Sequence, residues 1–278
     1  MLSFPNCKIN IGLHVTEKRA DGFHNIETIL VPADWQDILE IVPDEKTTDD
    51  IDFKCTGIRL FGTKEKNLCL RAYNLLAQHH KLPSIKMHLH KIIPVGAGLG
   101  GGSADAAHTI LILNKIFKLN ISEKDQENFS NQLGSDCAFF IRNKPVFASG
   151  KGEIFESVKL KIKNIFCIIV KPRIHISTTE AYSRIKPRKR NTSLRELIQQ
   201  PISDWKNSIE NDFEKIVFEK NPAIKNIKSR LYKLGAVYAA MSGSGSAVYG
   251  LFTEEKHLNT YFRSSTVWSG TLNVGTKY

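Results

Sequence analysis

The sequence predicts an α+β fold in two packed parts. Apolar and polar residues alternate over residues 7–15, which is the pattern of a β-strand near the start of the chain. Later, a strand pattern over 85–92, a glycine-rich loop and a helix pattern follow one another. Beyond residue 156 the succession of strand and helix patterns starts afresh. We therefore predict one domain over residues 1–156 and a second, smaller α+β domain over residues 157–278.

The amino-terminal region is predicted to be a β-meander. Alternation over 7–15 puts Lys8 and Asn10 on one face of a half-buried strand, because successive side chains of a strand point to opposite faces. A polar turn over 17–22 ends this strand. Further strand patterns lie at 23–31, 38–42 and 51–55.

Several helix starts are marked by residues that can cap a helix. Asn67 can cap an amphipathic helix, and Ser122 with Asp125 marks another start. A helix is also predicted from near Ser103, where the glycine-rich loop ends, and the turn over 134–137 leads into one more. Later helix patterns lie near Thr179, Ser193, Trp205 and Pro222, and strand patterns lie at 165–171 and on both sides of 242–246.

Composition is typical of a globular protein that does not span a membrane. The chain has 278 residues, 41% of them hydrophobic and 24% charged, and a formal net charge of +11. No apolar run approaches the roughly 18 residues of a transmembrane helix, and the amino terminus lacks the pattern of a secretory signal. Five cysteines without a Cys-x-x-Cys pair argue against a disulfide framework or a structural zinc site. We expect a cytoplasmic protein.

The loop over residues 94–104 carries the clearest sign of chemistry. Its sequence is Pro-Val-Gly-Ala-Gly-Leu-Gly-Gly-Gly-Ser-Ala, between a predicted strand and a predicted helix. Glycines let backbone N–H groups come close to a ligand, and a helix N-terminus carries about half a positive charge. The sequence therefore predicts that this loop binds phosphate groups.

Known glycine-rich phosphate loops differ in the residues around the glycines. A Walker loop needs a Lys before its Ser or Thr, whereas Gly102 precedes Ser103 here. Residues 96–101 fit the dinucleotide pattern Gly-x-Gly-x-x-Gly, but they follow several strands, and the ribose-binding acid would have to be Glu123 or Asp125 at a helix start. The sequence has neither the His-Arg-Asp nor the Asp-Phe-Gly motif of protein kinases. A dinucleotide oxidoreductase is therefore the weaker alternative, and the other two types are excluded.

The loop resembles that of the GHMP kinases, the superfamily that includes galactokinase, homoserine kinase and mevalonate kinase. Two further signatures of this superfamily occur in order, at residues 5–10 (Pro-Asn-Cys-Lys-Ile-Asn) and 241–246 (Met-Ser-Gly-Ser-Gly-Ser). The resemblance implies the two-domain GHMP kinase fold and an ATP-dependent kinase whose acceptor is a small alcohol. The matching residues of the loop are Pro94, Gly98, Leu99, Ser103 and Ala104.

The resemblance also implies that the loop holds the phosphates of ATP. Mg²⁺ accompanies ATP in this family, but the sequence has no dense carboxylate cluster, so metal ligands are left unassigned. Ser103 could reach a phosphate or Mg²⁺, and it could also cap the helix that follows. The expected ATP-binding residues are Pro94, Val95, Gly96, Ala97, Gly98, Leu99, Gly100, Gly101, Gly102, Ser103 and Ala104.

A more specific resemblance depends on residues 19–24, Arg-Ala-Asp-Gly-Phe-His. This stretch resembles the GHMP kinases that phosphorylate the 2-hydroxyl of 4-diphosphocytidyl-2-C-methyl-D-erythritol in the methylerythritol phosphate, or non-mevalonate, route to isoprenoids. A GHMP kinase for another small alcohol is the alternative within the superfamily. The stretches that support the same branch are 8–13, 98–107, 133–136 and 150–153.

Phosphoryl transfer to an alcohol requires a group that takes the hydroxyl proton. The resemblance assigns this role to Asp136 and pairs it with Lys8, which would lower the pKa of the substrate hydroxyl. From spacing alone, Asp136 could equally be an acid at a helix start and Lys8 a solvated strand residue.

Substrate contacts are expected on both parts of the chain. Phe23 and His24 align with family residues that stack on and hydrogen-bond the cytosine, although strand packing would explain Phe23 equally well. Thr178 and Tyr182 resemble residues near the cytidine, and a helix start is the alternative. The glycines of the carboxyl-terminal signature would let the backbone approach the acceptor, or they form a hairpin turn. The expected substrate-binding residues are Asn10, Phe23, His24, Thr178, Tyr182, Gly243 and Gly245.

The excess positive charge lies in one segment. Residues 159–195 contain eleven Lys and Arg and a single acid, Glu180. This segment could attract anionic substrates, or it is a solvated basic loop. Its Lys-Pro-Arg-Lys-Arg run at 186–190 also suits a nucleic-acid-binding protein, the alternative from another class. We expect ATP and the cytidine compound as partners, no nucleic acid or membrane, and a monomer or homodimer.

Overall fold

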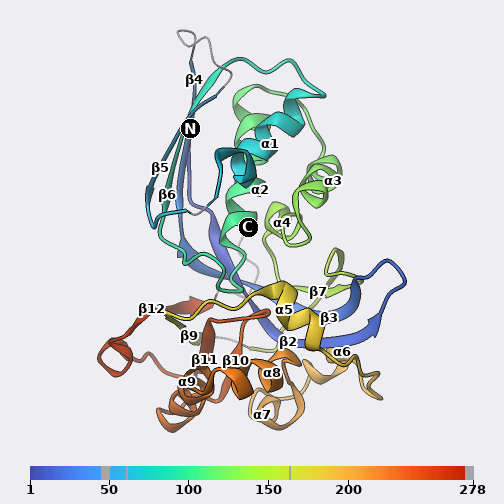
Figure 1. Cartoon of the computed structure of the whole chain (residues 1–278), viewed down its shortest axis with the longest axis vertical. Helices are drawn as coiled ribbons and strands as arrows, with labels where there is room; N and C mark the ends of the chain where they lie inside the picture. Colours follow the sequence, from blue (N-terminus) through green and yellow to red (C-terminus); the bar gives the residue numbers. More distant parts are fainter. Residues whose placement is uncertain (45–50, 61, 163, 273–278) are drawn as a thin grey trace. The chain divides into compact units, whose positions relative to one another are not determined.

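The computed structural model describes residues 1–44, 51–60, 62–162 and 164–272. These residues form two compact units (Figure 1). Unit 1 contains residues 1–7, 35–95 and 100–143, and unit 2 contains 8–34, 96–99 and the described chain from 144 onward. The domain boundary near residue 156 divides the sequence at one point, whereas each unit is built from three segments. Because the two divisions are of different kinds, the units do not test that boundary, and it stays a prediction.

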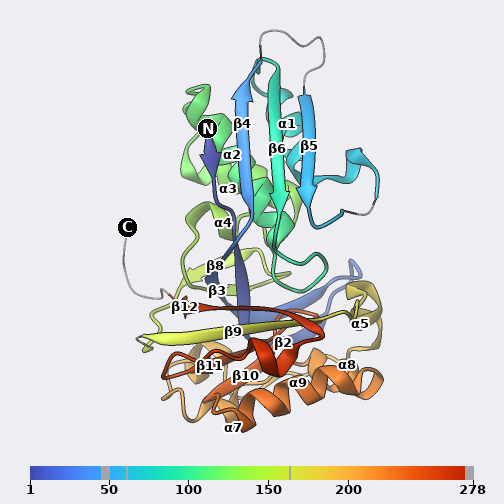
Figure 2. The same ribbon diagram turned by 90° about the vertical axis from the view of Figure 1, so that its left-hand side faces the viewer.

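Unit 1 contains a four-stranded sheet with helices on one face (Figures 1 and 2). The strand order is β1-β4-β6-β5, and β5 is parallel to β6, whereas the other neighbours are antiparallel. The strands are β1 (Leu2–Ser3), β4 (Ile38–Pro43), β5 (Ile51–Gly57) and β6 (Ile85–Lys91). The helices are η1 (Lys64–Lys66), α1 (Leu68–Ala77), α2 (Gly101–Ile116), α3 (Glu123–Leu133) and α4 (Phe139–Arg142).

Apolar residues of the sheet and of α1 and α2 form the core of unit 1. Leu39, Leu76, Met87 and Ile110 belong to one cluster and are at most 1% exposed. The connection from β5 to the parallel strand β6 contains α1, as a parallel pair requires a crossover. The predicted starts of α1 and α3 are confirmed, since Asn67 and Ser122 each accept a backbone N–H in the first turn of the helix.

Unit 2 contains an antiparallel sheet in the order β10-β11-β9-β12. Helix α9 lies beside β10 and β11, and α8 packs against α9 (Figure 2). The strands are β9 (Ile165–Pro172), β10 (Tyr238–Met241), β11 (Val248–Phe252) and β12 (Ser265–Leu272). The helices are α5 (Thr178–Arg184), α6 (Leu194–Leu197), α7 (Trp205–Ser208), α8 (Phe213–Lys220), α9 (Pro222–Lys233) and η2 (Asn259–Phe262).

A third sheet has the order β2-β3-β7-β8. The predicted β-meander is therefore wrong, because the first two long strands join this sheet whereas β4 and β5 both pair with β6. Alternation identifies a strand but not its partner, which depends on residues far away in the sequence. The strands are β2 (Asn6–Lys18), β3 (His24–Gln36), β7 (Val146–Ser149) and β8 (Ile154–Ser157).

Strand β2 is buried on both faces over residues 6–15, so the predicted half-buried strand is also wrong. Lys8 and Asn10 are each only 3% exposed. Polar groups at such positions need hydrogen-bond partners, and these partners define the site described below. Across the described residues, no helix has the length and apolar character needed to cross a membrane.

Candidate active site

The middle of the glycine-rich loop contacts the carboxyl-terminal glycine turn within unit 2. Ser242 Oγ donates to the Gly98 carbonyl at 2.9 Å. Gly98 has φ +78°, and a Cβ there would overlap the Ser242 carbonyl oxygen. Gly243, with φ +56°, places its own Cβ position 3.3 Å from Gly98 Cα. Because both backbones approach so closely, both glycines are needed, and two of the predicted motifs come together here.

The amino-terminal motif meets the same loop. The Lys8 backbone N–H donates to the Leu99 carbonyl at 2.9 Å. Lys8 Nζ donates to Asn10 Oδ1 at 2.6 Å, and Ser242 Oγ lies 3.3 Å from the same oxygen. Asn10 Nδ2 in turn donates to Thr28 Oγ1 at 3.0 Å. The three predicted motifs thus form one hydrogen-bonded group that holds a buried ammonium among glycine-rich turns.

The end of the loop forms the start of α2 in unit 1. Gly100 is the N-cap residue in the left-handed region, with φ 71°. Since glycine has no side chain to cap the helix, the N–H groups of the first turn are left for a ligand. Ser103 lies inside this first turn and not at the N-cap, so its predicted capping role is wrong. Helix α2 therefore begins at Gly101, two residues before the predicted start near Ser103.

Asp136 lies in the turn before α4 in unit 1 and is half-buried. The Cys137 N–H closes this turn on the Gly134 carbonyl at 3.0 Å. Burial raises the pKa of the Cys137 thiol to about 11, and a hydrogen bond with the Ser103 side chain opposes this shift. The predicted base is therefore next in sequence to a buried thiol that contacts the first turn of α2. Because Lys8 and Asp136 belong to different units, their pairing stays a prediction.

The residues expected to bind cytidine form a chain of contacts in unit 2. The rings of His24 and Tyr182 are 5.2 Å apart, and Tyr182 packs edge-on against Phe213 at 4.8 Å. Thr178 Oγ1 lies 2.9 Å from Ser244 Oγ, between the two glycines of the carboxyl-terminal turn. His24 therefore contacts Tyr182, and the glycine turn contacts Thr178, four residues earlier on α5.

Phe23 is not packed into the strand core. Its side chain is 58% exposed, and Lys151 Nζ lies 4.9 Å from the ring centroid. Strand packing is therefore excluded as its explanation. Phe23 thus exposes an aromatic ring to solvent, next in sequence to the half-buried His24.

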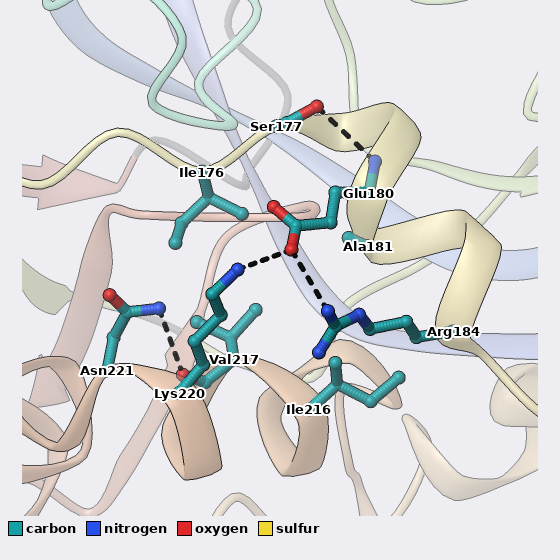
Figure 3. A pocket seen from close by; sticks show the side chains of 9 residues that line it. All are labelled: Ile176, Ser177, Glu180, Ala181, Arg184, Ile216, Val217, Lys220 and Asn221. Carbon is teal, nitrogen blue, oxygen red and sulfur yellow. Dashed lines mark hydrogen bonds and ion pairs between the residues drawn. The ribbon is translucent and has the colours of Figure 1, made fainter.

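Helix α5 is held from its other side by charged residues (Figure 3). Ser177 caps the helix by accepting the Glu180 N–H at 3.3 Å, and Glu180 forms ion pairs with Lys220 of α8 and with Arg184. The pocket around these side chains encloses about 30 Å³, which is too small for a nucleotide. We assign it to the packing of α5 and not to ligand binding.

Two arginines of the basic segment are already neutralised. Arg188 is paired with Glu210 at 3.1 Å, and Arg190 is paired with Glu210 at 3.2 Å and with Asp212 at 2.5 Å. The Arg188 N–H also donates to the Val15 carbonyl at 2.9 Å. These contacts attach the segment to β2 and to residues 210–212 of the same unit, and they weaken the hypothesis that its charge attracts substrate.

Sequence patterns missed several polar residues that support the site. Asn211 Nδ2 donates to the carbonyls of Met241 and Gly243 at 2.7 and 2.8 Å and so holds the glycine turn. Tyr249 Oη donates to the Asn10 carbonyl at 2.8 Å. No motif marked Asn211 or Tyr249, because each acts on a backbone carbonyl that is distant in sequence.

The described residues contain no group of three or more His, Cys, Asp or Glu side chains that could hold a metal ion. The metal ligands, which the sequence left unassigned, stay unassigned.

Comparison with known proteins places the chain in a family. The family models described as GHMP kinases N terminal domain and GHMP kinases C terminal match residues 67–144 and 193–260. A protein of Bacteroides fragilis named 4-diphosphocytidyl-2-C-methyl-D-erythritol kinase is 48% identical over 258 residues, which is 93% of this chain and 94% of the relative. The chain belongs to the GHMP kinase family. The α+β GHMP kinase fold and the kinase class predicted from the motifs are thus confirmed.

Other proteins support the same placement of this GHMP kinase. A relative in Parabacteroides distasonis with the same name is 47% identical and covers 98% of this chain and 100% of its own. A crystal structure of 4-(cytidine 5'-diphospho)-2C-methyl-D-erythritol kinase has a TM-score of 0.84 and 27% identity, and covers 99% of this chain and 100% of that one. A homoserine kinase of Cytophaga hutchinsonii, at 17% identity and a TM-score of 0.67, shares the fold.

Proposed function

We propose that this GHMP kinase transfers the γ-phosphoryl group of ATP to the 2-hydroxyl of 4-diphosphocytidyl-2-C-methyl-D-erythritol. The acceptor is supported by curated relatives of that name that align over more than nine-tenths of the chain. The observation that carries phosphoryl transfer is the hydrogen-bonded group of Lys8, Asn10, the loop middle and the glycine turn. The methylerythritol phosphate route, a cytoplasmic location and a monomer or homodimer belong to the same proposal.

The roles of the residues follow from the chemistry of the transfer. The Asp136 carboxylate takes the proton of the 2-hydroxyl as the hydroxyl oxygen bonds to the γ-phosphorus. The bond from that phosphorus to the bridging oxygen breaks, and ADP leaves with its electron pair. Lys8, held by Asn10, stabilises negative charge near the acceptor, and the N–H groups of residues 96–104 hold the phosphates. Mg²⁺ enters as part of the substrate, MgATP.

The proposal is tested by coupled measurement of ADP release with four acceptors. We expect turnover with 4-diphosphocytidyl-2-C-methyl-D-erythritol and at least about 100-fold lower kcat/KM with mevalonate, homoserine and galactose, because a pocket built for a nucleotide rejects acceptors that lack one. Preference for one of the other three alcohols would contradict the acceptor, and no turnover with the first would overturn the proposal. RNA affinity with a steep salt dependence and no ATP turnover would favour the nucleic-acid alternative.

His24 gives this function a pH dependence. Burial, and to a lesser extent Lys18, lowers the pKa of His24 below its ordinary value, so the ring is neutral near pH 7.5. A neutral ring offers both a hydrogen-bond donor and an acceptor to the cytosine, and protonation removes the acceptor. We expect KM for the cytidine substrate to rise as pH falls through that lowered pKa, while KM for ATP stays constant.

Replacing His24 by Phe should raise KM for the cytidine substrate about tenfold, the effect of one lost hydrogen bond, and remove its pH dependence. Steady-state kinetics between pH 5 and 8 measure both effects. His257→Phe, at an exposed position, is the control. The same pH profile in His24→Phe and in the unmodified protein would remove His24 from the binding site.

A further inference from the structure

A buried ionic cluster in unit 1 has no part in the chemistry above. It consists of Lys91 at the end of β6, Asp37 before β4 and Asp105 in α2, and we call these residues the Lys91 cluster. Their exposed fractions are 2%, 0% and 2%. Lys91 Nζ is 2.8 Å from Asp105 Oδ2 and also forms an ion pair with Asp37. Burying three charges costs free energy, and apolar side chains of similar volume would often stabilise the core equally well. Stability of the core therefore does not explain the Lys91 cluster.

Asp37 holds the start of the glycine-rich loop. Its Oδ1 accepts the backbone N–H groups of Ile92 at 2.5 Å and of Ile93 at 2.9 Å. These two residues follow β6 and come directly before Pro94, where the loop begins. The Asp37 backbone is itself fixed, since its N–H donates to the Pro5 carbonyl at 2.8 Å. The entry of the loop is therefore attached to a carboxylate that also binds Lys91.

Asp105 holds the other end of the loop. It lies about one turn into α2, the helix that the loop starts at Gly101. A Cβ at Gly101 would lie 2.9 Å from Ile93 Cγ2 and 3.3 Å from Lys91 Nζ. The first turn of α2 thus packs directly against the residues at the loop's entry. One ammonium joins the segment before the loop to the helix after it.

We propose that Lys91, together with Asp37 and Asp105, is a positioning group that fixes the two ends of the glycine-rich loop for ATP binding. This inference rests on the proposed function. Lys91 acts through the two carboxylates and not on a phosphate, because its ammonium is buried and directed at both of them. A loop with fixed ends has its N–H groups in place before ATP arrives, so less ordering is needed on binding.

The charge state of the cluster suggests how to test it. Burial raises the pKa of Asp105 to about 7, against the opposing effect of Lys91 and with the support of Asp37. The thiols of Cys69 on α1 and Cys55 on β5 also face these charges. Asp105→Asn resembles the protonated carboxyl and keeps an oxygen that can accept from Lys91. It therefore gives a background in which the attachment remains but one buried charge is gone.

The decisive comparison is Asp105→Asn against the double variant Lys91→Met/Asp105→Asn. Two measurements are made: the Kd of a non-hydrolysable ATP analogue, and amide hydrogen exchange over residues 94–102. We expect Asp105→Asn to stay within about twofold of the unmodified protein, because the hydrogen bond is kept. The double variant should bind the analogue at least about tenfold more weakly and exchange faster in the loop, with KM for the acceptor within about twofold.

Lys86→Met is the matched control. Lys86 lies on the same strand, β6, and is paired with Asp44 at 3.0 Å, but it is five residues away from Lys91. It should change neither the Kd nor the exchange of the loop. If the double variant does not fold, Asp37→Ala replaces it, since this change frees the Ile92 and Ile93 N–H groups and leaves a neutral Lys91–Asp105 pair.

Unchanged analogue affinity and unchanged loop exchange in the folded variant would overturn the inference. An equal loss in Lys86→Met would overturn it as well, because the effect would then be one of general stability. Failure of the proposed function would give a different experimental result. The unmodified protein would then turn over no cytidine substrate, whereas loop exchange would still report on the Lys91 cluster.

Discussion

Replacing Asp136 with Asn is expected to lower kcat by about 10²- to 10⁴-fold, or about 3–5 kcal/mol in the activation free energy. The amide has the size of the carboxylate but cannot accept the hydroxyl proton. Asp136 is half-buried in a turn that the Cys137 N–H closes, and this backbone contact does not use the carboxylate. The turn should therefore keep its shape, and the loss should appear in kcat with little change in the Kd of ATP.

Single-turnover kinetics, with separate titration of a non-hydrolysable ATP analogue, distinguish this outcome from a binding defect. Asp125→Asn is the control, because Asp125 lies in the same unit and its carboxylate accepts from the Ser122 cap at the start of α3. A kcat close to that of the unmodified protein in Asp136→Asn would show that another group takes the proton. Equal losses in the two variants would point to damage to the fold.

Local sequence patterns predicted the elements of the fold better than their partners. Caps identify a helix start from a few neighbouring residues, and Ser122 was found in this way. Short strands such as β1 and β8 have too few residues for a periodic pattern, and they were missed. Strand β2 was found, but its burial on both faces depends on residues from other parts of the chain.

In the candidate site, too, features marked by local sequence patterns were found, whereas those that depend on distant residues were missed. The glycine-rich loop and the carboxyl-terminal glycine turn were each found, because a close backbone approach requires glycine and a run of glycines is visible in the sequence. Their contact through Ser242 was not predicted. The Lys91 cluster could not be anticipated from patterns, since Asp37 is separated from Lys91 by 54 residues and Asp105 by 14. Ion pairs between distant residues leave no periodic signal, and only the fold brings them together.

Replacing Gly98 with Ala is expected to lower the free energy of unfolding by about 2–5 kcal/mol. The residue has φ +78°, a conformation that costs an L-residue about 1–2 kcal/mol. The new methyl group would also overlap the Ser242 carbonyl, and overpacking of this kind costs about 1–3 kcal/mol. Since Ser242 Oγ donates to the Gly98 carbonyl, moving the loop away to relieve the overlap breaks that bond.

Gly235→Ala separates the two costs, because Gly235 has φ +98° and no atom within 4 Å of its Cβ position. Urea unfolding should show a loss of only about 1–2 kcal/mol for this variant, the backbone cost alone. Equal losses of unfolding free energy in Gly98→Ala and Gly235→Ala would mean that the loop moves away from the Ser242 carbonyl without a cost in free energy. A larger loss for Gly98→Ala, together with a raised KM for ATP, is the expected result, because the contact that excludes a side chain also sets the path of the loop.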